Sequence, residues 1–425
     1  MTRLEERLAD ALEARAKAVD HRSVRPLPQA GELVRGHWAG SGSRRWLAPA
    51  AAAISLVLVA TVATVVSRHG PGAGQEPISS QRATFRGELD HVEALSATNV
   101  WAVGSIYTHP TTIYYNSREP VIMHWDGRSW RRVAAPRRAA GGELMSIAGG
   151  SPNDLWAVGG WLGDRPQTGS SLIAHWNGKS WRLVRSRPAG SGDGELLDVS
   201  ARTSTDVWAV GAAKKGALIL HWNGRSWNRL PAPQAGAGLE LYGVTALSSR
   251  DAWAVGGDNN GEVVMHWNGT RWRLVRTPSA GPGPAGLATV TALSAREVWA
   301  AGTVADGIGL QVIRWDGRTW QLMPDRGFPS FGQGFDAVAA TSPDDLWAVG
   351  RAGRFTPGTL IMHWNGLSWS RTTSPELNLQ GTLMGLSARS PNDVWAVGLH
   401  DSDDPHSERP LILHWDGTSW TMVLR

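Results

Sequence analysis

The sequence has 425 residues, 42% of them hydrophobic and 19% charged, which is enough for a globular core with an appendage. It has no cysteine, so disulfide bridges and cysteine-ligated metal centres are excluded. The formal net charge is +5, but residues 69–425 hold 32 basic and 31 acidic residues, and this balance does not indicate nucleic-acid binding. Arginine outnumbers lysine by 38 to 4, which is typical of a GC-rich bacterial genome such as an actinobacterial one.

Residues 1–45 predict a short amphipathic helix on the cytoplasmic side of a membrane. Thr2 and Glu5 form a capping box at the start of a helical pattern that runs to about Val19. One face of this helix carries Leu4, Leu8, Leu12 and Ala16. The face either docks on a cytoplasmic partner or belongs to a short solvated helix, and the sequence leaves both interpretations open.

Residues 46–67 predict a single transmembrane helix. These 22 residues carry no charge, and as a helix they span about 33 Å, enough for a hydrocarbon core of about 30 Å. Nine basic residues precede the segment and only three follow it as far as Arg86, which keeps the N-terminus cytoplasmic. A cleaved signal peptide fits less well, because 45 residues precede the apolar segment. A twin-arginine export signal at Arg44 and Arg45 is a further alternative. Residues 68–84 predict a flexible tether.

Two phrases then recur seven times each, and they contain 21 of the 24 Trp residues. The turn phrase is HWDGRSW from His124, HWNGKSW from His175, HWNGRSW from His221, HWNGTRW from His266, RWDGRTW from Arg314, HWNGLSW from His363 and HWDGTSW from His414. The strand phrase is NVWAVG from Asn99, DLWAVG from Asp154, DVWAVG from Asp206, DAWAVG from Asp251, EVWAAG from Glu297, DLWAVG from Asp345 and DVWAVG from Asp393. Steps of 45 to 51 residues predict the blades of a propeller or the units of a solenoid.

Each unit predicts four short antiparallel strands. The hydrophobic period is 2, as in SLIAHW from Ser171 followed by SWRLV from Ser180, and no helical pattern fits. The Asp-Gly or Asn-Gly pair between these runs predicts a type I′ hairpin turn. Seven such units over residues 85–425 predict an all-β, seven-bladed β-propeller. A solenoid is the alternative, but neither end of the array carries a polar capping unit.

The repeats resemble two known families over about residues 85–425. The strand order, with second strands that end in Gly159-Gly160 or Gly256-Gly257, is similar to kelch repeats. The turn phrase is similar to the Asp-box of sialidase-type and photosystem-assembly-factor-type propellers. Here the acid is kept at Asp126, Asp316 and Asp416 and replaced at Asn177, Asn223, Asn268 and Asn365. The resemblance implies the propeller architecture rather than any one family's activity.

The repeated aromatic residues predict structural roles. Large Trp side chains at equivalent places favour packing between blades over carbohydrate-stacking platforms. His precedes the first Trp of the turn phrase in six units and Arg314 takes its place in the other, which favours hydrogen bonding or packing over metal ligation.

No motif for catalysis or cofactor binding is found. A GxSxG elbow, an HExxH pair and a Walker loop are absent from the sequence, and the GxGxxG at Gly281–Gly286 has two prolines and no helix to follow. We therefore expect no cofactor, no metal site and no catalytic residue. A sialidase-like or other glycan-active hydrolase remains the alternative, because Tyr114, Tyr115, Arg118 and Glu119 share one loop.

The loops between second and third strands are longest in blades 1, 2 and 7, which are neighbours in a closed ring. Loops on a rigid scaffold often carry binding residues, although drift in unconstrained loops also lengthens them. The predicted binding residues are Tyr107, His109, Tyr114, Tyr115, Trp161, Arg165, His400, Asp401, Asp403, Asp404 and His406. The acidic run at 401–404 is also compatible with a hard cation.

Together these features predict a single-pass membrane protein whose propeller lies outside the cytoplasm. Its function is predicted to be non-enzymatic binding or sensing of a protein or glycan on the outer face. Nucleic acid is not expected as a partner.

Overall fold

The computed structural model describes residues 81, 83–108, 118–161, 170–187, 194–278, 286–304, 309–326, 328, 334–351, 358–373, 381–400 and 408–424. Contacts divide the chain into two compact units, 1–74 and 75–425, and every described residue belongs to the second. The predicted N-terminal helix and the predicted membrane span at 46–67 lie outside the described residues. Among the residues that are described, no helix has the length and apolar character needed to cross a membrane.

The described elements form seven four-stranded sheets, here called blades 1 to 7. Blades 1 and 2 are β1 (Gly87–Ser96), β2 (Asn99–Tyr107), β3 (Arg118–Trp125), β4 (Trp130–Val133) and β5 (Gly142–Ser151), β6 (Asp154–Trp161), β7 (Ser171–Trp176), β8 (Trp181–Leu183). Blades 3 and 4 are β10 (Glu195–Thr203), β11 (Asp206–Ala213), β12 (Gly216–Trp222), β13 (Trp227–Arg229) and β14 (Glu240–Ser248), β15 (Asp251–Asp258), β16 (Gly261–Trp267), β17 (Trp272–Val275). Blades 5 and 6 are β18 (Gly286–Ser294), β19 (Glu297–Thr303), β20 (Leu310–Trp315), β21 (Trp320–Leu322) and β22 (Gly334–Ser342), β23 (Asp345–Arg351), β24 (Thr359–Trp364), β25 (Trp369–Arg371). Blade 7 is β26 (Gly381–Ser390), β27 (Asp393–His400), β28 (Arg409–Trp415) and β29 (Trp420–Leu424).

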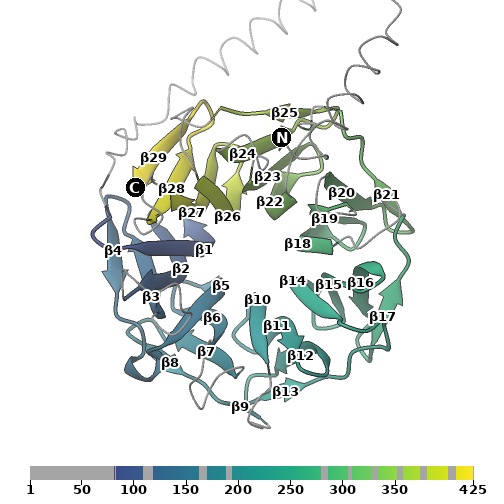
Figure 1. Ribbon diagram of the computed structural model, residues 1–425, viewed down its shortest axis with the longest axis horizontal. Coiled ribbons are helices and arrows are strands. Elements are labelled where there is room, and N and C mark those ends of the chain that lie inside the picture. Colours follow the sequence, from purple (N-terminus) through teal and green to yellow (C-terminus); the bar gives the residue numbers. More distant parts are fainter. Residues whose placement is uncertain are drawn as a thin grey trace, which may run out of the picture. The chain divides into compact units, whose positions relative to one another are not determined.

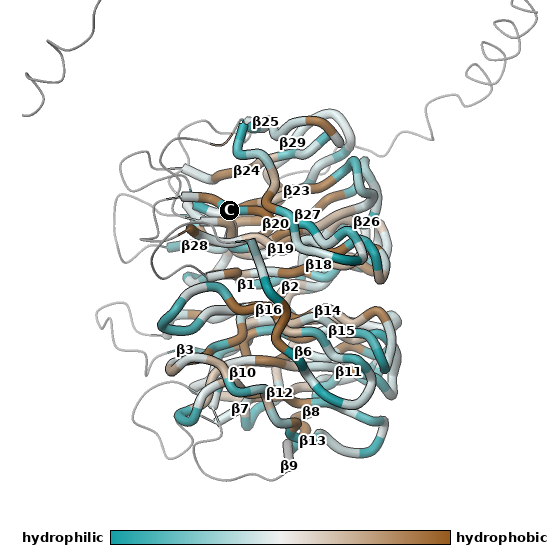
Figure 2. The backbone as a smooth tube through the Cα atoms, turned by 90° about the vertical axis from the view of Figure 1, so that its right-hand side faces the viewer, coloured by the Kyte–Doolittle hydropathy of each residue, from teal (hydrophilic) through white to brown (hydrophobic). Residues whose placement is uncertain are grey.

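These blades confirm the predicted seven-bladed all-β propeller. Within each blade the four strands pair in chain order and antiparallel, and the first strand of every blade lies innermost in the ring (Figure 1). Residues of all seven first strands line a cavity, which is the central channel. The side view shows strands crossing the thickness of the ring (Figure 2). Two short elements lie outside this plan: the two-residue strand β9 (Ser186–Arg187), which pairs parallel with β13, and a 3-10 turn, η3 (Arg137–Ala139).

The core is divided among the seven blade interfaces. Seven buried apolar clusters each combine residues of two neighbouring blades, and the one between blades 7 and 1 has the same character as the others. At the interface of blades 1 and 2, the ring of Trp101 lies 5.0 Å from Trp176 and 5.9 Å from Trp181. At the interface of blades 7 and 1, Trp395 lies 5.6 Å from both Trp125 and Trp130. The predicted packing role of the repeated Trp residues is therefore confirmed.

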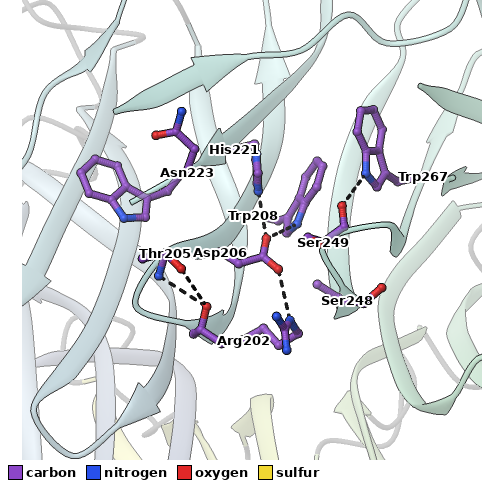
Figure 3. Close-up of polar contacts among 12 residues, drawn as sticks. Arg202, Thr205, Asp206, Trp208, His221, Asn223, Ser248, Ser249 and Trp267 are labelled. Atoms are coloured by element: carbon purple, nitrogen blue, oxygen red, sulfur yellow. Dashed lines mark hydrogen bonds and ion pairs between the residues drawn. The ribbon is translucent and has the colours of Figure 1, made fainter. Parts of the chain in front are cut away.

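A polar contact joins the two repeated phrases inside each blade. In blade 3, Asp206 Oδ1 accepts a hydrogen bond from Trp208 Nε1 at 3.2 Å and lies 2.9 Å from His221 Nε2 (Figure 3). His221 also lies 4.2 Å from the Trp208 ring. In blade 5, where the strand phrase begins with Glu297, the partner is Arg314, which donates to it at 2.7 Å. The predicted structural role of the His is confirmed, and its partner is the first residue of the strand phrase.

The predicted type I′ turn is wrong. Trp125 pairs with Trp130, so four residues rather than two form the loop of blade 1. Asp126 Oδ1 accepts hydrogen bonds from the backbone N–H groups of Arg128 at 3.0 Å and Ser129 at 2.9 Å. The Asp or Asn is required because its side chain satisfies these N–H groups, as in an Asx turn.

The seam between blades 7 and 1 uses residues that precede the predicted start of the propeller at residue 85. Gln81 forms a parallel bridge with Leu424, and its backbone N–H donates to Val423 O at 2.7 Å. The Gln81 side-chain oxygen accepts a hydrogen bond from the N–H of Trp130 at 2.8 Å. Ala83 is buried in the same cluster. Gln81 therefore links the outer strand of blade 7 to the outer strand of blade 1.

The geometry of the repeated turn predicts that Gly417→Val destabilises blade 7. Gly417 has a φ of +95°, and an added Cβ would lie 2.5 Å from Asn392 Oδ1. We expect a loss of about 2 kcal/mol in the free energy of unfolding. Urea denaturation measures it, with Gly286→Ala as control because a Cβ there meets nothing within 4 Å. Equal midpoints for the two variants would contradict the assignment of the turn.

Candidate functional site: the mouth of the channel

One position at the start of the inner strands makes the channel mouth asymmetric. The register of each inner strand aligns this position in every blade, one residue before the partner of the second-strand glycine. From blade 1 to blade 7 it is occupied by Glu88, Glu143, Glu195, Glu240, Gly286, Gly334 and Thr382. Glutamates therefore occupy this position in blades 1 to 4, and no carboxyl side chain occupies it in blades 5 to 7.

The half formed by blades 1 to 3 is filled by a network around Arg118. Its Nη1 donates to Glu88 at 2.8 Å and to Glu143 at 2.7 Å, and both carboxylates are less than a tenth exposed. The Arg118 guanidinium also lies 5.3 Å from the centre of the Tyr107 ring. Burial raises the pKa of the Tyr107 hydroxyl far above its usual range, and Glu88 and a hydrogen bond to Glu408 add to this effect.

Glu195 extends this network as part of a carboxyl pair. Its carboxyl group is hydrogen-bonded to that of Glu143, and two carboxyl groups make this bond only when they hold a proton between them. Burial, followed by repulsion from Glu143, raises the pKa of Glu195 to about 7. Burial also raises the pKa of Glu143, although Arg118 opposes this. A raised pKa of this size favours a protonated Glu195 carboxyl just below neutral pH.

The half formed by blades 4 to 7 is open. It contains a cavity of about 750 Å³, a size usual for ligand sites. The cavity is lined chiefly by Glu240, Tyr242, Asp258, Asn259, Gly286, Gly302, Gly334, Asp336, Arg351, Thr382 and Met384. A Cβ added at Gly286 would meet nothing within 4 Å, so the missing side chain there leaves open space.

Polar groups are fixed on two walls of this cavity. Tyr242, which is 38% exposed, donates from its hydroxyl to Glu240 at 2.8 Å. On the other wall Arg351 Nε donates to Thr382 Oγ1 at 2.9 Å. Reduced solvation by the channel walls raises the pKa of the Asp336 carboxyl to about 6, and Arg351 opposes this shift. The cavity thus offers an aromatic ring, carboxyl groups and one guanidinium to a ligand.

Deeper in the channel, several polar side chains have structural roles. Asp198 accepts hydrogen bonds from Ser146 Oγ in blade 2 and from the backbone N–H of Val244 in blade 4, both at 2.7 Å. Ser387 Oγ accepts from the N–H of Ala94 across the seam at 3.1 Å. The pKa of Glu93, raised to about 7 by burial and by Asp198, belongs to the same wall. We therefore place the candidate site at the mouth rather than in the depth of the channel.

Three of the predicted binding residues are described, and all three end second strands of the neighbouring blades 1, 2 and 7. Tyr107 is half-buried against Arg118, Trp161 packs partly buried against the interface of blades 1 and 2, and His400 is half-buried at the end of β27. The others, His109, Tyr114, Tyr115, Arg165, Asp401, Asp403, Asp404 and His406, lie outside the described residues. Within the described ranges, no group of three His, Asp or Glu side chains is arranged to hold a metal ion.

The sequence prediction missed the mouth glutamates and the opposing glycines. A signal existed, because Gly-Glu-Leu occurs at 87–89, 142–144 and 194–196 and Leu-Glu-Leu at 239–241. It becomes informative only when the inner strands are aligned, since the equivalent residues of blades 5 and 6 are glycines among other glycines.

The proton held by Glu143 and Glu195 predicts a pH-dependent stability. Because the folded pKa of Glu195 is raised, the folded state binds more protons than the unfolded chain between about pH 4.5 and 7, so stability falls as pH rises through this window. Glu195→Gln keeps a hydrogen-bond donor and should reduce the loss of unfolding free energy between pH 5 and 8 by about 1–3 kcal/mol. Urea denaturation at both pH values, with the exposed Glu119→Gln as control, measures this. Identical pH profiles for wild type and Glu195→Gln would contradict the shared proton.

Comparison with known proteins supports the architecture. No protein-family model and no curated protein matches the sequence. The structure reported as YCF48 bound to D1 peptide is 14% identical, with 80% of this chain and 95% of that chain covered and a TM-score of 0.53. YCF48 from Cyanidioschyzon merolae and U3-55K are each 12% identical, each cover 74% of this chain, with 94% and 88% of their own chains, and have TM-scores of 0.51. At such low identity the similarity establishes a shared propeller fold.

Proposed function

We propose that this protein is a non-enzymatic binding module whose ligand inserts into the open half of the channel mouth. The observation that carries the proposal is the replacement of the mouth glutamate by Gly286, where an added Cβ would meet nothing within 4 Å, in a cavity of about 750 Å³ that Tyr242 and Asp336 also line. Gly334 has a local reason to be glycine, since its φ is +150° and an added Cβ would lie 2.5 Å from Thr303, but the described contacts of Gly286 give no such reason.

Binding is favoured over glycan hydrolysis by the pairing of the charged groups. A sialidase-like site requires a cluster of arginines that face the substrate. Among the described residues of the mouth, Arg118 is engaged by Glu88 and Glu143, and Arg351 lies across the channel in blade 6. Tyr242 and Glu240 form a hydrogen-bonded pair, but no second arginine stands beside them in the described part of the cavity.

The proposed ligand is a protein segment or a glycan, and the mixed walls favour a polar ligand. YCF48, which shares the fold, has been described with a bound D1 peptide, so a peptide is the first class to test. The loops predicted from the sequence in blades 7, 1 and 2 follow second strands that end at the same face as the mouth. We propose that they contact the part of the ligand outside the cavity.

We also propose that the propeller is anchored outside the cytoplasm by residues 46–67. The support is the uncharged 22-residue segment and the basic residues that precede it. The kinship with kelch or Asp-box repeats is likewise a proposal, supported by the Asx turn that Asp126 and its counterparts form.

The proposed binding site predicts that filling the cavity weakens the binding of the ligand. Peptides selected from a random display library on the unit 75–425 should bind Gly286→Leu at least tenfold more weakly, because the leucine fills open space. Leu367→Ser, on the exposed rim of blade 6, is the control, and a glycan array serves as the parallel screen. If binding survives Gly286→Leu but is lost when the blade 1 loop between Ser105 and Pro120 is shortened, the ligand uses the loops and not the cavity.

The proposed anchor predicts the orientation of the chain in the membrane. A reporter enzyme that works only outside the cytoplasm should be active when it is fused after Arg425, and one that works only in the cytoplasm should be inactive. The reason is that the positive-inside rule keeps the N-terminus in the cytoplasm. The measurement compares an exported and a cytoplasmic reporter on the same chain. Activity of the cytoplasmic reporter alone would end the proposal of an extracytoplasmic propeller.

A further inference from the structure

The outer hairpins of blades 1 and 2 carry an unbalanced positive charge. Between residues 126–133 and 177–185 six exposed basic side chains stand against one acid, Asp126, which pairs with one of them at 3.3 Å. These six, here called the basic rim, are Arg128, Arg131, Arg132, Lys179, Arg182 and Arg185. The matching hairpins of blades 6 and 7, residues 365–373 and 416–424, carry one basic residue, Arg371, and one acid, Asp416. The charge of the outer hairpins therefore differs between the two sides of the seam.

The chain joins the propeller at this seam. Gln81 lies between Leu424 of blade 7 and Trp130 of blade 1, and Arg131 and Arg132 directly follow Trp130. The outer strands β4 and β29 are neighbours on the outside of the ring (Figure 1). Only 13 residues, 68–80, separate Gln81 from the predicted membrane span, and they reach at most about 45 Å. An anchored propeller therefore keeps the edge at blade 1 within reach of the bilayer.

We propose that the basic rim docks on the anionic phospholipid surface of the membrane in which the chain is anchored. The inference rests on the anchor proposed above. Arginine donates two parallel hydrogen bonds to phosphate oxygens, and five of the six rim residues are arginines. Docking at blades 1 and 2 would turn the channel mouth sideways to the bilayer, so that its cavity stays open to soluble ligands.

Phospholipid is favoured over nucleic acid because of position and reach. Charge attraction acts over about 8 Å at physiological salt, so it operates only on a surface that the tether already brings close. A polyanion in solution would select blades 3 and 4 as readily, because their outer hairpins carry Arg225, Arg229, Arg271, Arg273 and Arg276. The short chain to Gln81 distinguishes blades 1 and 2 from these.

The test uses the full-length protein in lipid nanodiscs. The chain has no cysteine, so Ser180→Cys, next to Lys179 of the basic rim, and Ser370→Cys on blade 6 each give one labelling site on an exposed side chain. A fluorophore at each position is quenched by a nitroxide on the lipid headgroup, in discs of phosphatidylcholine alone or with about 30% phosphatidylglycerol. We expect strong quenching at residue 180 in the anionic discs, little at residue 370, and loss of the difference in about 0.5 M NaCl.

A triple variant tests the residues themselves. Arg131→Gln with Arg132→Gln and Arg182→Gln should abolish the quenching at residue 180. The matched control, Arg229→Gln with Arg271→Gln and Arg273→Gln, removes the same charge from blades 3 and 4 and should leave it unchanged. The docking proposal would be overturned if the two labels were quenched equally, or if the label at residue 180 were quenched as strongly in neutral discs as in anionic discs. It would also be overturned if the two triple variants had equal effects.

Failure of the anchor would be seen separately. Extraction of the protein from membranes by alkaline carbonate would contradict the anchor, whereas docking would still require binding to vesicles with about 30% phosphatidylglycerol at low salt, weakened at least tenfold by the first triple variant. Absence of that binding overturns the rim as well. Binding of duplex DNA that the first triple variant removes, with no response to phosphatidylglycerol, would assign the rim to nucleic acid instead.

Discussion

The contact on which the whole propeller depends is the packing of one blade's second-strand Trp against the third- and fourth-strand Trp residues of the next blade. A four-stranded blade cannot bury both of its faces alone, so each interface supplies a separate core. The contact between Trp395 and Trp130 closes the seam with the same geometry, near 75°, as the 74° between Trp101 and Trp181. Closure therefore needs no exchanged strand, and Gln81 adds a single bridge to an interface that is already apolar.

This packing explains why the polar part of the repeat is fixed as well. The Trp208 ring is held from one side by His221, and Asp206 binds both the indole N–H and the imidazole. A rotated Trp would lose that bond and its contacts in the next blade together. In blade 5 Glu297 binds Arg314 instead, and the Arg314 guanidinium lies 5.1 Å from the Trp299 ring, so a different pair of side chains keeps the contact with the Trp face. The phrase is thus constrained by orientation of the Trp rather than by chemistry at the surface.

The repetition of the blades sets how much of the fold could be predicted from the sequence alone. Blade number, strand order and the role of Trp follow from repetition, because hydrophobic period and spacing act locally. The turn could not be predicted from Asp-Gly alone, since the loop length depends on the register between Trp125 and Trp130. The partner of His221 lies 15 residues away, and only the pairing of β11 with β12 brings the two together. The asymmetry of the channel mouth could not be predicted from the sequence, because Glu240 and Gly286 are recognised as equivalent positions only when the registers of all seven inner strands are known.

The distribution of charge over the propeller could not be predicted from its net charge. The propeller has nearly equal numbers of acidic and basic residues, and that total suggests no particular field. The ring distributes the two signs unevenly: carboxyl groups such as Glu143, Glu195 and Asp336 outnumber the arginines in the described part of the channel mouth, while Arg132, Arg182 and Arg273 stand on exposed outer strands. Burial, assisted at Glu195 by repulsion from Glu143, raises the pKa values of Glu195 and Asp336, whereas the outer arginines are spread apart in water and do not repel one another strongly. A near-neutral propeller can therefore present an acidic centre and a basic edge to different partners, because the inner strand and the outer strand of each blade vary independently.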